Sequence, residues 1–322
     1  MKRRVLMNTE ELKAKARACG ADLLGIAPVA RFKDVPPEQN PMSIFPECKS
    51  VIVLARRICR GSLRGVEEGT NFASTYQCFG YTWVEDNFLS QTSYDLSLWI
   101  EEQGAEAVPI FAYNEAGMPK GLPVAPDRPA PNVYIDPRYA VTAAGLGEVG
   151  LGGFILTPEF GTRQRFAFIL TDAELSGDEV RGKTLCSDCG GCAAACPFGA
   201  IHLDKTETLS VLGHAMKIAQ IDLNLCAVCP NGAFLASGRG KEPDRIAAAC
   251  GRECLVRLEK AGKLGNCFEN TFRKRAPWQL DAFKRPMARD ASGAMKAVDV
   301  GCGKFSDTGV VSVHATGQVF SK

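Results

Sequence analysis

The sequence contains no long apolar run and no recognisable export signal. No stretch of about 18 apolar residues occurs, so no membrane span is expected. Arg3 and Arg4 could begin a twin-arginine signal, but only residues 5–7 are apolar before polar residues follow. We therefore expect a cytoplasmic protein.

The net charge is small, and the sequence contains few histidines. The formal net charge of the 322 residues is +2, which gives no case for binding a nucleic-acid backbone or an anionic membrane. A basic triplet at 273–275 could contact RNA, although such triplets are more often solvated surface. The three histidines lie outside any metal-ligand spacing, so imidazole ligation of a metal is unsupported at His202, His214 and His314.

Cysteine, in contrast, is abundant, and four of the 14 cysteines fall in one short run. Cys186, Cys189, Cys192 and Cys196 are followed by Pro197, which gives the spacing C-x2-C-x2-C-x3-C-P. This is the bacterial ferredoxin spacing for a [4Fe–4S] cluster, in which the fourth cysteine ligates the other cluster of a two-cluster protein. We predict iron–sulfur binding rather than a structural zinc site or disulfides, and hence a role in electron transfer.

Two further cysteine pairs complete the number required for two [4Fe–4S] clusters: Cys226 with Cys229, and Cys250 with Cys254. One cluster would take the first three cysteines of the run and one distal thiolate, and the other would take Cys196 and three distal thiolates. Chain order favours Cys254 as the exchanged ligand, whereas the proline that follows Cys229 favours that residue, and both remain open. The alternative is one cluster plus buried thiols that behave as small hydrophobes. The other cysteines are interpreted as core or incidental: Cys19, Cys48, Cys59, Cys78, Cys267 and Cys302.

Alternating helix and strand patterns predict an α+β or α/β sheet domain over residues 1–175. A separate cysteine-rich domain is expected at 176–268, and a C-terminal tail at 269–322 that packs back on the core. Thr9 is a plausible N-cap for the first helix. The expected elements are helices at 9–19, 93–103 and 139–146, and strands at 21–27, 50–55, 107–111 and 165–172.

A glycine-rich turn follows the third expected helix. Its glycines would let the backbone approach a bulky cofactor closely. The turn superficially matches a dinucleotide-binding fingerprint, but it follows a helix rather than a strand, so the Rossmann context fails. The candidate cofactor-binding residues are Gly145, Gly147, Gly150, Gly152 and Gly153. An aromatic group could line a flat cofactor face or pack in the core: Tyr76, Tyr81 and Trp83.

The stretch 143–175 together with the cysteine run resembles a segment shared by epoxyqueuosine reductases and corrinoid reductive dehalogenases. The stretches 13–29, 94–111 and 133–147 are similar in kind, and the resemblance covers roughly residues 8–260. It implies an α+β architecture: an α/β nitroreductase-like cobalamin domain packed against a C-terminal bacterial ferredoxin-like domain. In such enzymes two [4Fe–4S] clusters pass low-potential electrons to the cobalt of cobalamin, which reduces the substrate.

The resemblance also implies candidate proton donors. Asp136 matches an aspartate that resembles a general acid in the epoxyqueuosine reductases, and a turn-capping role is the alternative. Tyr139 and Arg138 are the other candidates, because the dehalogenases use a tyrosine with a basic neighbour. An external electron donor of the ferredoxin or flavodoxin type is implied as a partner.

Several departures leave the substrate open between a small molecule and tRNA. Glu148 and Leu151 stand where epoxyqueuosine reductases usually have a tryptophan and a lysine, and no proline follows the pair Cys250 and Cys254. The respiratory dehalogenases usually carry an export signal, which this sequence lacks. There are two alternatives to a corrinoid reductase. One is an electron-transfer protein without its own organic cofactor, and the other is a protein with a flavin in the same pocket.

Overall fold

The fold is known from a computed structural model. It describes residues 7–68, 70–112, 121–180, 182, 184–227, 229, 232–235, 242–270, 272, 279–280, 286–289, 292 and 294–297. Most of the predicted tail, including the basic triplet at 273–275, Cys302 and His314, lies outside these residues. The described parts of the tail form a small antiparallel sheet of β11 (Gln279–Leu280), β12 (Pro286–Arg289) and β13 (Met295–Ala297).

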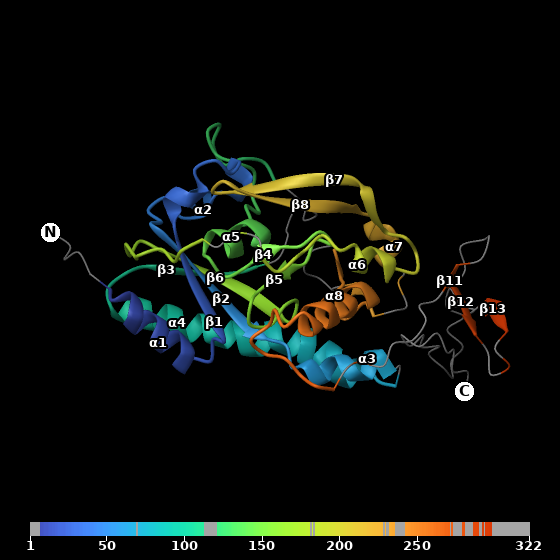
Figure 1. Ribbon diagram of the computed structural model, residues 1–322. Coiled ribbons are helices and arrows are strands. Elements are labelled where there is room, and N and C mark those ends of the chain that lie inside the picture. The colour runs from blue at the N-terminus through green and yellow to red at the C-terminus, as the bar shows by residue number, and fades with distance from the viewer. Residues whose placement is uncertain are drawn as a thin grey trace, which may run out of the picture.

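A four-stranded antiparallel sheet forms the centre of the N-terminal part (Figure 1). Its strand order is β1 (Leu23–Pro28), β2 (Ser50–Arg57), β6 (Gln164–Thr171) and β3 (Ala107–Phe111). The apolar run predicted as a central strand is β2, whose first six residues are all buried. All pairings in this sheet are antiparallel, so the mixed fold is α+β rather than a parallel α/β sheet.

Side-chain alternation along β2 builds two cores, one on each face of the sheet. Ile52 and Leu54 point to a core shared with α1 (Thr9–Ala18) and α4 (Ser90–Glu102). Val51 and Val53 point to the opposite core, which contains α5 (Pro137–Ala143) and the inner side of β8 (His214–Ile221). Figure 1 shows α1 and α4 below the sheet and α5 with the β7–β8 hairpin above it.

The three helices expected in this part are present, with shifted ends. Asn8, and not Thr9, is the N-cap of α1, because its side chain accepts hydrogen bonds from the amides of Glu10 and Glu11. The segment around Tyr76 and Tyr81, for which no element was predicted, is widely wound π-helix, η4 (Ala73–Thr82) and η5 (Val84–Leu89), which runs directly into α4. The short elements between these are η1 (Val29–Phe32), η2 (Pro37–Gln39), α2 (Pro41–Ile44), η3 (Arg60–Leu63), α3 (Arg64–Glu68), β4 (Glu148–Val149) and β5 (Ile155–Leu156).

The cysteine-rich part consists of a long hairpin and short helices. The hairpin pairs β7 (Ile201–Val211) with β8, and its register shifts between His202 and Thr206. Helix α6 (Gly191–Ala194) and helix α8 (Ala249–Lys260) contact each other. The remaining elements are α7 (Leu223–Ala227), β9 (Phe234–Leu235) and β10 (Pro243–Asp244).

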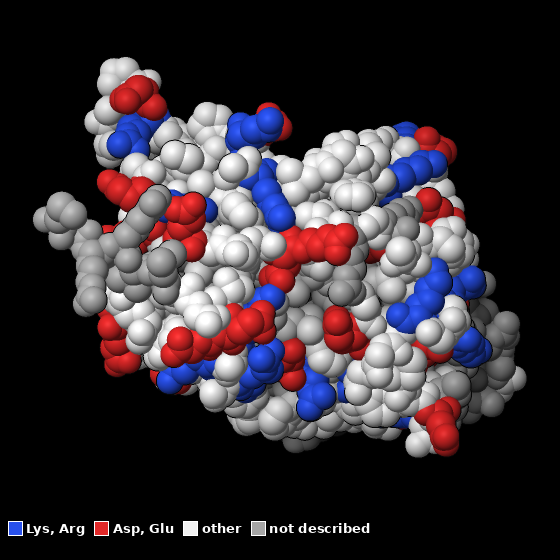
Figure 2. All heavy atoms as spheres, turned by 60° about the vertical axis from the view of Figure 1, so that its left-hand side comes forward, with Lys and Arg blue, Asp and Glu red and all other residues white. Residues whose placement is uncertain are grey.

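Acidic and basic side chains are interspersed over the face in Figure 2, without a continuous basic stretch. Among the described residues no helix combines the length and the apolar character needed to span a bilayer.

Candidate functional site

The eight predicted cluster ligands gather into two groups of four, each around its own cavity. One cavity, of about 70 Å³, is lined by what we call the first cysteine set: Cys186, Cys189, Cys192 and Cys254. Another, of about 10 Å³, is lined by the second cysteine set: Cys196, Cys226, Cys229 and Cys250. The structure thus places Cys254, and not Cys229, beside the first three cysteines of the run.

Helix α8 contributes one thiol to each set. Cys250 and Cys254 lie one turn apart on this helix, and each borders a different cavity. A Cβ added to Gly191 of α6 would lie 2.3 Å from Nε of Arg257 on α8, so the two helices pack closely. This packing brings Cys192 of α6 to the same cavity as Cys254.

Burial makes several of these thiols difficult to ionise without a nearby cation. Burial, followed by the charge of Cys250, raises the pKa of Cys192 to about 11. Burial also raises the pKa of Cys226 to about 11, although Arg245 opposes the shift. For Cys254, burial and then the charge of Cys192 raise the pKa well above its ordinary value. Metal binding requires the thiolate form, so a bound metal would have to supply the compensating positive charge.

The donor sets suit iron–sulfur clusters. Each cavity is lined by four sulfur donors, and thiolates select zinc or iron–sulfur clusters. No three His, Cys, Asp or Glu side chains of the described residues form a group that could hold a single metal ion. Four sulfur donors around a cavity suit a tetrahedral zinc ion or a [4Fe–4S] cluster, and the ferredoxin spacing of the cysteine run favours the cluster.

Backbone amides support one sulfur atom in each set. The amide of Leu151 donates to Cys186 Sγ at 3.3 Å, and the amide of Ala200 donates to Cys196 Sγ at 3.3 Å. The buried carboxylate of Glu148 accepts the amides of Thr184, Leu185 and Cys186 at 2.5, 3.0 and 2.7 Å. Glu148 thereby fixes the loop that begins the first cysteine set.

A cavity of about 930 Å³ adjoins both cysteine sets. Strand β6, the β7–β8 hairpin and residues 242–246 line it together with the start of α5. Phe154 lines both this cavity and the first cysteine cavity, and Arg245 lines both this cavity and the second. Ligand cavities typically measure about 300–1,000 Å³, so this one can admit a bulky organic cofactor.

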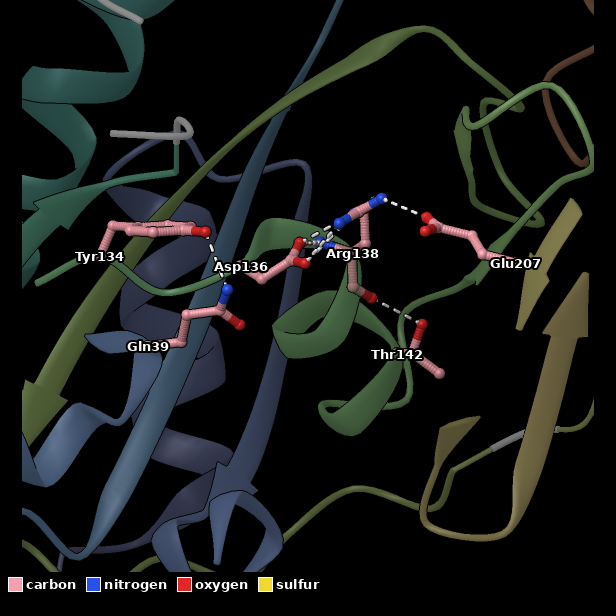
Figure 3. Close-up of polar contacts among 6 residues, drawn as sticks. All are labelled: Gln39, Tyr134, Asp136, Arg138, Thr142 and Glu207. Carbon is pink, nitrogen blue, oxygen red and sulfur yellow. Dashed lines mark hydrogen bonds and ion pairs between the residues drawn. The ribbon is translucent and has the colours of Figure 1, made fainter. Parts of the chain in front are cut away.

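Asp136 and Arg138 line the large cavity at the N-terminus of α5 (Figure 3). Asp136 is the N-cap, and its Oδ1 accepts the Arg138 amide at 2.8 Å. The Arg138 guanidinium donates to both carboxylate oxygens at 2.9–3.2 Å and reaches Glu207 at 3.5 Å. Burial alone would lower the pKa of Arg138, but the hydrogen bond and charge of Asp136 outweigh it and raise the pKa.

Tyr139, the third candidate proton donor, is not among the residues that line the large cavity. Its hydroxyl donates to the Arg31 carbonyl at 2.7 Å, and its ring contacts Phe32. Burial raises its pKa, and the charge of Asp34 adds to the shift. The structure therefore brings Asp136 and Arg138 to the cavity and holds Tyr139 elsewhere.

The predicted glycines pack mainly against other parts of the protein, and one of them, Gly153, lines the large cavity. A Cβ on Gly145 would lie 2.2 Å from the Glu179 carbonyl oxygen, and one on Gly147 would lie 2.1 Å from that of Leu156. Three others border a cavity: Gly150 and Gly152 line the first cysteine cavity, and Gly153 lines the large one.

A buried polar network lies on the wall of the large cavity, and its contacts are not apparent from the sequence. Arg165 Nη2 donates to Asp244 Oδ2 at 2.7 Å and to the Tyr76 hydroxyl at 2.9 Å, and that hydroxyl donates to Asp244 at 2.7 Å. The Arg165 guanidinium also lies 4.7 Å from the ring centroid of Tyr81, which lines the cavity. Arg165 lies inside an apolar strand and Asp244 is 79 residues away, so only the tertiary fold reveals the pair.

The other described residues singled out from the sequence are not among those that line these cavities. Trp83 is 43% exposed, whereas Tyr76 is fully buried. His202 and His214 lie on the β7–β8 hairpin. Cys48 is buried, Cys19 and Cys78 are half-buried, and Cys59 and Cys267 are exposed.

Comparison with known proteins finds no matching family model, but it finds related sequences. A tetrachloroethene reductive dehalogenase from Dehalobacter restrictus is 31% identical over 120 residues, which are 36% of this chain and 18% of the relative. The corresponding protein of Sulfurospirillum multivorans is 27% identical over 228 residues, which are 60% of this chain and 40% of the relative. The matched regions thus span less than half of each relative.

A solved reductive dehalogenase structure shares the fold. A catabolic reductive dehalogenase superposes with a TM-score of 0.51 and 19% identity, covering 80% of this chain and 33% of that one. An epoxyqueuosine reductase in complex with a tRNA stem loop has a TM-score of 0.41 and 14% identity over 79% of this chain and 82% of that one. The comparisons confirm the resemblance to reductive dehalogenases inferred from the sequence, together with the mixed α/β fold.

Proposed function

We propose that this chain is a reductase in which each cysteine set holds a [4Fe–4S] cluster and the large cavity holds a corrinoid. The observation that carries the proposal is that two four-cysteine cavities adjoin one large cavity, through Phe154 and Arg245. The sequence similarity to reductive dehalogenases and the shared fold support the same function.

The proposed division of the chain follows the elements. Residues 1–175 would form a nitroreductase-like cofactor domain and residues 176–268 a ferredoxin-like domain, with 269–322 as a tail that packs back on the core. The central sheet lies in the first range and all eight predicted ligands lie in the second. The large cavity is lined from both ranges, so the organic cofactor would be bound between them.

Bound clusters would supply low-potential electrons, and a bound corrinoid would supply the cobalt chemistry of the reduction. The protein would supply the proton. We propose that Asp136 delivers it from its carboxyl group, with Arg138 and then Tyr139 as alternative donors. For this role Asp136 Oδ2 must be released by Arg138 Nη2, which donates to it at 2.9 Å.

The substrate is proposed to be a small organic molecule or a nucleoside-type compound. The curated relatives are named for tetrachloroethene and match only part of their length, so a small organohalide is the first substrate to test. We further propose a cytoplasmic protein that receives electrons from a ferredoxin or a flavodoxin.

The proposal is tested by counting cofactors. The chain is purified anaerobically, reconstituted with iron, sulfide and cobalamin, and analysed for metal and corrinoid. We expect about eight irons and one corrinoid per chain, and then chloride release from tetrachloroethene or reduction of epoxyqueuosine under reducing conditions.

Two other outcomes would redirect the proposal. About eight irons without corrinoid affinity would contradict the cobalt step and leave an electron-transfer protein without its own organic cofactor. A flavin absorption spectrum after denaturation would assign the large cavity to flavin.

A further inference from the structure

The first cysteine set lies beside a buried carboxylate. Glu148 is 3% exposed and accepts three backbone amides, including that of Cys186 itself. An ionised carboxylate is an acceptor only, and all three of these contacts come from donors. Glu148 therefore places a negative charge next to the sulfur ligands of the first set.

The second cysteine set lies beside a guanidinium group. Arg245 lines this cavity, its Nη2 donates to the Gly152 carbonyl at 3.0 Å, and its Cζ lies 4.6 Å from the ring centroid of Phe154. Its Nη1 is buried and has no hydrogen-bond partner among the described residues. Cys226 and Cys250 line the same cavity, so the positive charge of Arg245 lies beside these two thiols.

Other charged groups lie near both sets. Lys263 lines the first cavity and donates to the carbonyls of Thr184 and Leu185 at 2.7 and 2.8 Å. Arg257 lines the same cavity, but its side chain is 48% exposed and paired with Glu253 at 2.7 Å. Near the second set, the Oδ1 of Asp222 accepts the amides of Asn224 and Leu225. Glu148 is thus the buried carboxylate beside the first set, and Arg245 is a half-buried cation beside the second.

We infer that Glu148 lowers the reduction potential of the cluster in the first cysteine set and that Arg245 raises the reduction potential of the cluster in the second. Reduction adds one negative charge to a cluster. A nearby carboxylate opposes this addition and a nearby guanidinium favours it, and burial limits solvent screening. The inference rests on the proposed function, because it requires that both sets hold clusters.

The test is an EPR-monitored redox titration of the full chain after anaerobic reconstitution, with C226S used to assign the second cluster's signal. We expect R245Q to lower the potential of that signal alone by about 59 mV, which is tenfold in the equilibrium constant of a one-electron couple. R245K should give a smaller shift in the same direction, because lysine keeps the charge but not the planar fork. E148Q should raise the potential of the other signal.

R57Q is the control, because Arg57 is 53% exposed, pairs with Asp22 at 3.2 Å and lines neither cysteine cavity; neither potential should move. Unchanged potentials in iron-loaded R245Q and R245K would overturn the inference, and R245K alone decides if R245Q does not hold its iron. A wild-type chain that binds no clusters would instead contradict the proposed function.

Discussion

Single side chains decide what the two cysteine sets bind. Both cavities present sulfur donors, and burial raises the pKa of Cys192 and Cys226 to about 11. Buried thiols of this kind are either inert or held as thiolates by a metal. Replacement of one thiol therefore distinguishes a ligand from a packing residue.

Cys254→Ser should reduce the iron content from about eight to about four per chain, because the cluster of the first set loses a ligand. Cys267→Ser is the control, since Cys267 is exposed and its thiol donates to the Leu264 carbonyl. Iron analysis and absorption near the cluster bands measure the outcome. Full iron content in C254S would contradict the assignment of this residue.

Asp136→Asn should lower the rate of substrate reduction by a factor of about 10²–10⁴, the usual contribution of a general acid. The amide side chain keeps an oxygen that can accept the Arg138 amide, so the cap of α5 and the cofactor content should be retained. Tyr139→Phe is the control, because Tyr139 does not line the large cavity. A normal rate in D136N with a slow rate in Y139F would transfer the role to Tyr139.

Cys48 should make stability fall at alkaline pH. Burial raises its pKa from 9.0 to about 11, so its contribution to folding stability is complete below pH 9 and is lost as the pH rises through 11. The midpoint temperature of thermal unfolding should therefore fall less steeply between pH 8 and pH 11 in C48A than in the wild type. An equal slope in the two proteins would refute this, and C59A, at an exposed thiol, should leave the slope unchanged.

At the scale of elements, the turn between α5 and β5 joins the sheet to the cysteine sets. Gly147 lies against strand β5, where an added Cβ would be 2.1 Å from the Leu156 carbonyl oxygen. Leu151 donates an amide to Cys186, and Glu148 fixes the loop before that cysteine. A change in this turn should therefore affect both the fold and the first cysteine set.

Gly147→Ala should lower the free energy of unfolding by about 1–3 kcal/mol, as overpacking against fixed backbone usually does. Gly61→Ala is the control, because nothing lies within 4 Å of the added Cβ. It should change stability by less than about 0.5 kcal/mol. Chemical denaturation measures both, and equal stability of the two variants would contradict the packing described here.

The sequence predicted the elements that follow one strong pattern. The apolar run of β2 and the amphipathic α4 were both apparent, because burial on both faces leaves a continuous apolar run and burial on one face leaves a helical periodicity. The π-helix around Tyr76 was missed, since its turns are wider than the α-helical period that a sequence search applies. The N-cap at Asn8 was assigned one residue late because Thr9 is also a good capping residue.

At the scale of the whole molecule, the fold assembles groups that the sequence keeps apart. Cysteine spacing identified eight candidate ligands. Chain order favoured Cys254 as the exchanged ligand and the following proline favoured Cys229, so the grouping of the eight stayed open. The large cavity is built from β6, α5, the β7–β8 hairpin and residues 242–246, so no local pattern could predict it. The pair of Arg165 and Asp244 on its wall is likewise a product of tertiary packing.

The central claim is that one chain holds two clusters and one corrinoid. Native mass spectrometry of the chain after anaerobic reconstitution measures all three in a single species. The account predicts a dominant mass equal to that of the protein with two [4Fe–4S] clusters and one cobalamin. A dominant species with zinc, or with only one cluster under conditions that saturate iron and sulfide, would contradict it.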